Sequence, residues 1–294
     1  MSMRKAFFQL HTAVFLAGFT GILGRLITLN EVLLVWYRLL ISVLTLWVLY
    51  YFKKPIQRIG AKDLYKIFAV GCVAALHWVT FYASIKSANV SVALVCFSSI
   101  GFFTAVMEPV IMHHRINIAE ILLGVLTIAG IYIVFHFEPQ FKTGIILGIL
   151  SAFLGCLFPI FNKKLLKSIS PETVTLFELT GGFIFITILM PVYMQFFPPV
   201  HFIPGWSDMG WLLVLSLLCT VVAFNLSMKA LQKISAFTVN LTYNLEPLYG
   251  ILLAFIFFRE DQLMKESFYV GLSLIVISVM IQTMLIYRKH QRVR

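Results

Sequence analysis

Charged side chains are scarce in this chain. Asp, Glu, Lys and Arg make up 12% of its 294 residues, whereas 60% are hydrophobic, and the mean hydropathy is +0.94. A soluble domain with this composition would have too few polar side chains to coat its apolar interior. A membrane protein needs no such coat, because lipid solvates its apolar exterior. The composition therefore excludes an ordinary soluble domain and predicts an integral membrane protein.

Paired cysteines and the common catalytic motifs are also missing. The four cysteines stand singly, with no CxxC or Cys/His spacing, so the pattern indicates neither a disulfide framework nor a metal site. The sequence contains no Walker A loop, HExxH or GxSxG pattern. We therefore expect no ATP hydrolysis by this chain, no metal, no other cofactor and no enzymatic activity.

The sequence has instead ten apolar stretches, each long enough to span a bilayer. They lie at about 6–26, 32–52, 64–85, 90–112, 119–137, 143–163, 173–197, 209–229, 234–258 and 266–287. Their connections are too short to hold a soluble domain. We predict an all-α integral membrane protein with ten transmembrane helices. We expect the first stretch to be a retained helix, because no signal-peptide cleavage pattern follows it.

The net charge of +11 comes from basic residues that gather on one side of the predicted membrane. If the N-terminus is cytoplasmic, 17 of the 23 Lys and Arg residues lie in cytoplasmic segments, five lie on the opposite side and Arg38 lies within a span. This bias is the one that the positive-inside rule describes. We predict a multi-pass protein of the cell (inner) membrane with both termini cytoplasmic. The charge then indicates attraction to anionic lipid, not nucleic-acid binding.

The ten stretches divide into two sets of five, at 6–137 and 143–287, followed by a basic cytoplasmic tail at 288–294. Arg38 in the second stretch and Glu178 in the seventh occupy matching depths. Glu-Pro pairs occur in the fourth and ninth stretches, although at different depths. Because five is odd, the second set must be inverted in the membrane relative to the first. Two inverted five-helix repeats around a central cavity are a recurrent transporter architecture.

Several short motifs extend this pattern. The ninth stretch carries Leu-Glu-Pro-Leu at 245–248 and ends in Phe-Phe-Arg-Glu at 257–260, the second stretch contains WYRLL around Arg38, and a basic loop followed by Ser-Pro lies within 161–179. With FFTAVMEP at 102–109, these segments resemble the EamA family of the drug/metabolite transporter superfamily. The chain departs from the family pattern at Gly101, where a proline is usual, and at His113 and His114, where Gly-Glu is usual. The resemblance implies two five-helix repeats and the movement of small metabolites, often the export of amino acids or related compounds.

Ionisable residues inside the spans are the strongest functional candidates, because a charge at the bilayer centre costs at least ~2.5 kcal/mol on insertion scales. We leave open whether Glu246 binds a cationic substrate group, carries a proton or hydrogen-bonds a neighbouring helix. Pro247 is predicted to break the helix beside it. Arg38 is a candidate clamp for a substrate carboxylate, a counter-ion for Glu178 or an interfacial side chain. Glu108 is expected to reach the interface or to pair with Arg115.

Polar and aromatic residues near these charges complete the predicted cavity. Trp78, Phe81 and Tyr82 share a helix face, and such a wall suits an amphipathic substrate or a cation held over a ring, although ordinary packing is an alternative. His77 is either an interhelical hydrogen-bonding residue or a proton carrier. The cavity lining that we predict consists of Glu246, Arg38, Glu178, Trp78, Tyr82, Asn225, Asn240, Tyr243 and His77.

These features together predict a secondary transporter. We expect it to export small metabolites, such as amino acids or related amphipathic compounds, by alternating access. A passive channel or facilitator is the alternative, and an intramembrane enzyme is a less favoured one. The expected partners are a small-molecule substrate and the lipid bilayer, with no nucleic acid. Proton coupling and the oligomeric state are left open.

Overall fold

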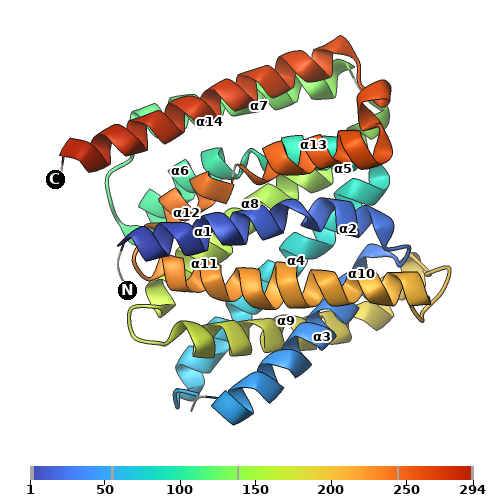
Figure 1. Ribbon diagram of the computed structural model, residues 1–294, viewed down its shortest axis with the longest axis vertical. Coiled ribbons are helices and arrows are strands. Elements are labelled where there is room, and N and C mark those ends of the chain that lie inside the picture. Colours follow the sequence, from blue (N-terminus) through green and yellow to red (C-terminus); the bar gives the residue numbers. More distant parts are fainter. Residues whose placement is uncertain (1–2, 54–55, 138, 244, 293–294) are drawn as a thin grey trace.

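The chain is built from helices throughout residues 3–53, 56–137, 139–243 and 245–292, which are the residues described by the computed structural model (Figure 1). The first half contains α1 (Met3–Gly18), α2 (Thr20–Leu26), α3 (Glu31–Lys53), α4 (Ala61–Ser87), α5 (Val90–Phe97), α6 (Ile100–Met112) and α7 (Ile118–Phe137). The 3-10 turn η1 (Pro139–Phe141) leads into α8 (Lys142–Leu165), α9 (Pro171–Phe196), α10 (Trp206–Ser216), the π-helix η2 (Leu217–Val222) and α11 (Ala223–Leu231). The chain continues through α12 (Ala236–Tyr243), α13 (Glu246–Phe258), the 3-10 turn η3 (Glu260–Leu263) and α14 (Glu266–Arg292).

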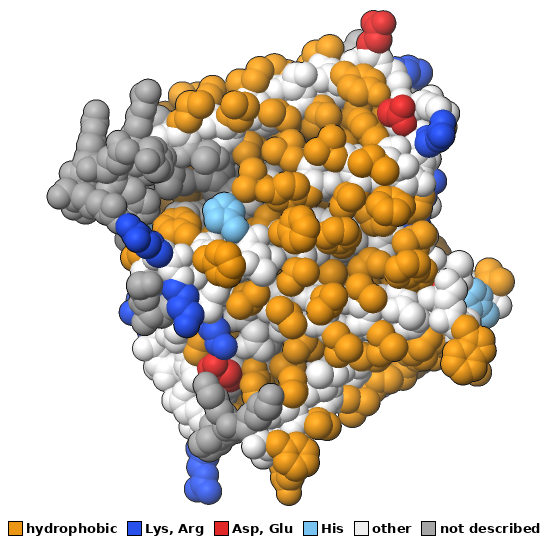
Figure 2. All heavy atoms as spheres, in the orientation of Figure 1, with side chains coloured by type: hydrophobic (Ala, Val, Ile, Leu, Met, Phe, Trp, Pro, Cys, Tyr) orange, Lys and Arg blue, Asp and Glu red, His pale blue; other side chains and the backbone are white. Residues whose placement is uncertain are grey.

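The helices are apolar enough to lie in a membrane. Seven helical stretches have the length and composition needed to cross one: Met3–Leu26, Glu31–Phe52, Ala61–Ser87, Val90–Met112, Lys142–Leu165, Pro171–Phe196 and Trp206–Leu231. Three shorter apolar segments add to them, at Ile118–Val134, Glu246–Phe258 and Glu266–Ile281. Figure 2 shows hydrophobic side chains across most of the visible face, with charged side chains toward its left and right edges. Lipid solvates such a face without further cover. The chain is therefore a helical, multi-pass membrane protein.

The helices fall on the predicted stretches, but four of those stretches are interrupted where continuous helices were expected. The first breaks at Phe19, between α1 and α2, and the fourth breaks at Ser98 and Ser99, between α5 and α6. In the eighth, the π-helix η2 joins α10 to α11. In the ninth, Leu245 lies in a turn before α13, and Asn244 lies outside the described residues.

Local chemistry accounts for two of these interruptions. At the break between α5 and α6, the hydroxyl of Ser98 donates to the Leu94 carbonyl and that of Ser99 donates to the Cys96 carbonyl, so side chains bind backbone groups at the end of α5. Pro247 lies in the first turn of α13. Its missing N–H and its ring prevent a regular bond to the carbonyl four residues earlier, so the helix restarts just before it.

Close backbone contacts between glycines hold the bundle together at two places. A Cβ added to Gly71 of α4 would lie 2.1 Å from the backbone oxygen of Glu178 and 2.9 Å from the backbone nitrogen of Gly182, both in α9. A Cβ on Gly130 of α7 would lie 2.6 Å from the backbone oxygen of Gly271 in α14. Small residues allow such approach in membrane proteins, where packing and not the hydrophobic effect joins helices. The long pair α7 and α14 lies along one margin of the bundle in Figure 1.

We expect Gly71→Val to destabilise the protein by about 1–3 kcal/mol, because the added carbons have no space between α4 and α9. The measurement is the midpoint of thermal unfolding in detergent. Gly210→Val is the matched control, since a Cβ on this glycine of α10 would meet no atom within 4 Å. Equal midpoints for the two variants would contradict the proposed tight contact.

Candidate functional site

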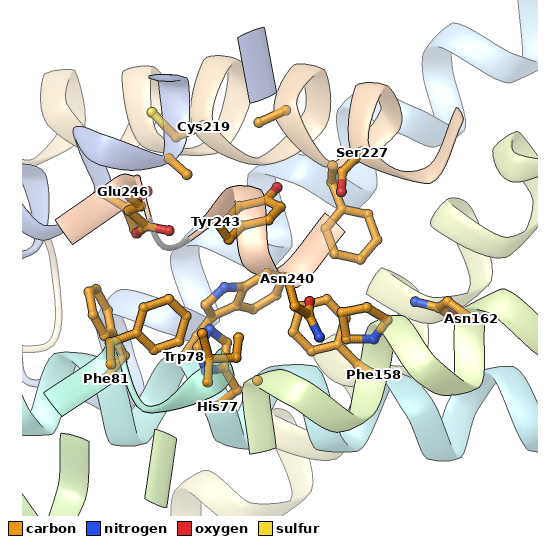
Figure 3. Close-up of a pocket in the computed structure, with 18 of the residues that line it drawn as sticks. His77, Trp78, Phe81, Phe158, Asn162, Cys219, Ser227, Asn240, Tyr243 and Glu246 are labelled. Carbon is orange, nitrogen blue, oxygen red and sulfur yellow. The ribbon is translucent and has the colours of Figure 1, made fainter. Parts of the chain in front are cut away.

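A cavity inside the bundle is bordered by all four helix interruptions. It encloses about 780 Å³ of space between atoms, including open space at its margin. Its wall contains Ala17 and Thr20 beside the first break, Phe97 and Ile100 beside the second, Cys219 of the π-helix, and Tyr243 and Glu246 beside the fourth (Figure 3). Irregular backbone at membrane depth is tolerated where it is buried in protein or lines a cavity. The interruptions therefore identify this cavity as the candidate functional site.

Arg38 and Glu246 bring a basic and an acidic side chain to this cavity without pairing with each other. Arg38 projects from α3 and Glu246 is the first residue of α13, and the two residues are 2% and 6% exposed. Within the described ranges, no ion pair within 4 Å joins them. A buried charge without a counter-ion is unfavourable unless other groups stabilise it. The cavity therefore contains a guanidinium and a carboxyl group, each with capacity for a further partner.

Neutral groups hold Arg38 in place. Its Nε donates to Thr220 Oγ1 at 2.7 Å, and one terminal nitrogen donates to the Tyr82 hydroxyl at 2.8 Å. The guanidinium carbon lies 4.3 Å from the centroid of the Trp78 ring. Thr220 belongs to the π-helix, so this irregular turn supplies one of the supports. A guanidinium has five N–H donors, and these two bonds leave others for a ligand.

Aromatic rings form much of the remaining wall. Trp78 and Phe81 come from α4, and Figure 3 shows them beside His77 on the same side of the cavity. Sequence analysis missed three other lining rings: Phe97, Phe158 and Phe224. Phe158 and Phe224 stack with their centroids 6.1 Å apart. The chain has 28 phenylalanines, so no compositional signal separates these three from the rings that face lipid.

Three predicted polar residues line the cavity in the structure: His77, Asn240 and Tyr243. The Nδ1 of His77 lies 2.9 Å from both the hydroxyl and the backbone oxygen of Ser151, and this contact joins α4 to α8. Asn240 donates to Thr104 Oγ1 at 2.9 Å, which joins α12 to α6. These side chains therefore link helices at the edge of the cavity as well as facing it.

Two predicted residues lie beside the cavity instead of lining it. Tyr82 is fully buried, and its hydroxyl accepts the hydrogen bond from Arg38 outside the cavity lining. Asn225 points away, and its amide nitrogen donates to the Tyr50 hydroxyl at 2.8 Å. Residues two apart on a helix face different directions, so Ser227 lines the cavity where Asn225 does not.

Glu178 is also outside the cavity lining. It is fully buried on α9 and forms no ion pair with Arg38 among the described residues, so matching depth did not bring the two charges together. The Asn162 side chain, which lines the cavity, faces the Glu178 carboxylate. Neither carboxylate oxygen and neither polar atom of this amide makes a hydrogen bond of good geometry in the described structure. Glu178 thus lies one side chain behind the cavity wall.

A membrane-embedded cavity at helix interruptions is the architecture of many secondary transporters. The model of the EamA-like transporter family matches this chain twice, at residues 4–136 and 142–284. The chain belongs to that family, within the drug/metabolite transporter superfamily, and the members of the family are transporters.

Comparison with solved structures supports the fold. Twenty-eight chains match, and one of them, titled "Crystal structure of protein", has a TM-score of 0.69. It shares 15% sequence identity with this chain, and the match covers 98% of this chain and 99% of the other. At this identity the likeness shows the fold alone. The comparison with curated proteins gave no match.

We expect Tyr82→Phe to weaken ligand binding by about threefold to tenfold, because the guanidinium of Arg38 loses one of its two hydrogen-bonded supports. Substrate-dependent thermal shifts would give the affinity once a substrate is found. Tyr50→Phe is the matched control, since it removes a hydroxyl whose partner, Asn225, points away from the cavity. The same loss of affinity in both variants would show that the contact with Arg38 has no special role.

Proposed function

We propose that this protein is a secondary transporter that binds small zwitterionic metabolites, such as amino acids or related amphipathic compounds, and exports them by alternating access. The observation that carries the proposal is the presence of Arg38 and Glu246 in one cavity without an ion pair between them. A guanidinium binds a carboxylate in a two-pronged geometry, and a carboxylate binds an ammonium group. A zwitterion would pair with the Arg38 guanidinium and with the ionised form of Glu246 at once.

The rest of the wall supports a substrate with an apolar portion. Trp78, Phe81 and Phe97 provide apolar surface near the charged groups. We therefore favour amino acids with apolar or aromatic side chains as the first compounds to test.

The proposal includes ten membrane crossings in two inverted repeats, at 6–137 and 143–287. The broken pairs α5–α6 and α12–α13 support it. The start, the break and the end of the second pair each lie 146 residues after those of the first. Each pair also ends in a left-handed residue, His113 with φ of 58° and Arg259 with φ of 52°. Figure 1 draws the two pairs running in opposite directions. The predicted cytoplasmic placement of both termini, with the tail at 288–294, completes this topology.

Proton coupling is the second part of the proposal. Glu246 is the one carboxylate in the described wall of the cavity, and its side chain is almost wholly buried. When the substrate leaves, a proton can neutralise this carboxylate in place of the ammonium group. Exchange of one for the other would couple outward movement of substrate to inward movement of protons.

A carrier accounts for the buried polar groups of this cavity better than a channel does. Among its described charged and polar wall residues, Arg38, His77, Asn162, Asn240 and Glu246 are each no more than 6% exposed. A channel needs a continuous wet path when it conducts. A site whose charged and polar side chains are buried instead suits a cycle in which the cavity opens to one side at a time.

The decisive measurement is flux in proteoliposomes with a panel of labelled amino acids. We expect saturable flux that responds to an imposed pH gradient, and we expect Glu246→Gln to lower it by about tenfold or more and to remove the response to pH. Glu266→Gln, which changes an exposed residue at the start of α14, is the control. Absence of saturable flux across the panel, or unchanged flux in Glu246→Gln, would refute the proposed site.

A further inference from the structure

A buried carboxylate joins the two halves of the chain at one end of the bundle. Glu260 follows α13 directly and is fully buried. Its side-chain oxygens accept hydrogen bonds from the backbone N–H of Val90 at 3.1 Å, from that of Ser91 at 2.8 Å and from the Ser91 hydroxyl at 2.6 Å. Arg25 at the end of α2 forms an ion pair with it. Glu260 of the second half therefore closes onto the first turn of α5 in the first half.

A second carboxylate has the corresponding place at the opposite end. Glu108 of α6 is 4% exposed and lies one turn after Thr104, whose hydroxyl accepts a hydrogen bond from Asn240 of α12. Because Ala236 lies one turn before Asn240 and the two helices run in opposite directions, Glu108 lies beside the first turn of α12, near the N–H groups of Ala236 and Phe237. The expectation that Glu108 reaches the interface or pairs with Arg115 is wrong, because the start of α12 supplies buried N–H donors and a favourable helix dipole. These contacts are looser than those of Glu260.

Basic residues stand beside both carboxylates. The counterpart of Arg25 is Lys163, near the end of α8 and within electrostatic range of Glu108. Its Nζ donates to the backbone oxygen of Leu231, the last residue of α11, at 2.6 Å, and to that of Ile234, in the turn before α12, at 2.7 Å. In each case the cation belongs to the same half as the helix start, while the carboxylate comes from the other half.

The two helix starts are structural equivalents. Val90 and Ser91 are 146 residues before Ala236 and Phe237. Their N-caps keep the same spacing. Asn89 accepts a bond from the Val92 N–H at 2.8 Å, and Ser235 accepts one from the Thr238 N–H at 3.1 Å. Equivalent helix starts therefore receive a carboxylate from the opposite half, although the two glutamates themselves are not equivalent in sequence.

We infer that Glu260 and Glu108 are the two latches of the transporter, one for each side of the membrane, and that alternating access releases one while the other holds. This inference rests on the proposed transport function. With both carboxylates in place the two halves of the chain are joined at both ends of the bundle. Rocking of one half against the other must withdraw a carboxylate from its helix start, and the freed carboxylate and N–H groups then require water. Release of a latch therefore opens and wets one end of the cavity.

The position equivalent to Glu260 in the first half is His114, 146 residues earlier. His114 is exposed and follows the left-handed residue His113. A histidine at this place supplies no carboxylate, and Glu108, six residues earlier in the chain, takes its role. We therefore expect that a glutamate at position 114 can take over the role of Glu108.

The native Cys219 provides a reporter, because it lines the cavity. In a full-length background with Cys72, Cys96 and Cys156 changed to Ala, an impermeant thiol reagent is applied to either side of sealed vesicles. We expect Glu260→Gln to raise the labelling rate by about tenfold from the side of the bundle on which residue 260 lies, and Glu108→Gln to do so from the other side. Glu266→Gln and Asp63→Asn are the respective controls.

A second substitution that restores the carboxylate distinguishes a latch from a merely structural residue. Glu108→Gln combined with His114→Glu should return the labelling rate to that of the parent. If Glu260→Gln fails to fold, Ser91→Ala removes one of the same hydrogen bonds and should raise labelling from the same side by a smaller factor. Unchanged labelling, or an equal rise from both sides, would overturn the inference.

Flux measurements distinguish this inference from the transport proposal. Side-specific labelling without amino-acid flux would support the latches and refute the proposed substrate. Flux that depends on Glu246 together with labelling that ignores Glu108 and Glu260 would refute the latches and leave the transporter.

Discussion

The structure depends on the need to satisfy backbone hydrogen-bonding groups where no water is present. A continuous helix meets this need by itself, and every interruption leaves N–H or C=O groups that require another partner. Here the interruptions near Phe19, Ser98, Cys219 and Leu245 are gathered around one cavity instead of being scattered along the bundle. Serine hydroxyls and buried protein supply substitutes at these places. The candidate binding site therefore lies where the regular helices are interrupted.

The same constraint explains how a charged site persists inside the membrane. Arg38 is held by a hydroxyl from η2, a phenol from α4 and the face of Trp78, none of which carries a negative charge. A direct ion pair with Glu246 would stabilise both groups but would also consume their capacity to bind ligand. Neutral supports lower the cost of burial while preserving the charge. Support by neutral groups thus leaves both side chains available to the proposed zwitterionic substrate.

Sequence alone predicts the parts of this molecule that hydrophobicity controls. Long apolar stretches indicate the helices, and the rarity of ionisable groups in them points to Arg38 and Glu246, which do line the cavity. The direction in which a side chain points is harder to predict, because its depth along a helix does not determine the face on which it lies. Glu178 is the example. The Ser98 break was also missed, since serines are common in uninterrupted membrane helices. Its effect depends on the bonds that its hydroxyl makes after folding.

The two halves share equivalent backbone positions around the cavity but place different side chains at them. Phe97 is equivalent to Tyr243, and Ile100 is equivalent to Glu246, each at a spacing of 146 residues, and all four line the cavity beside equivalent breaks. One side of the wall is therefore apolar where the other carries a hydroxyl and a carboxylate. For the proposed zwitterion, a symmetric wall would allow two opposite orientations, whereas this wall offers one carboxyl group to an ammonium group. The repeated backbone thus gives the two halves equivalent broken helices, while the unequal side chains make the two sides of the cavity wall chemically different.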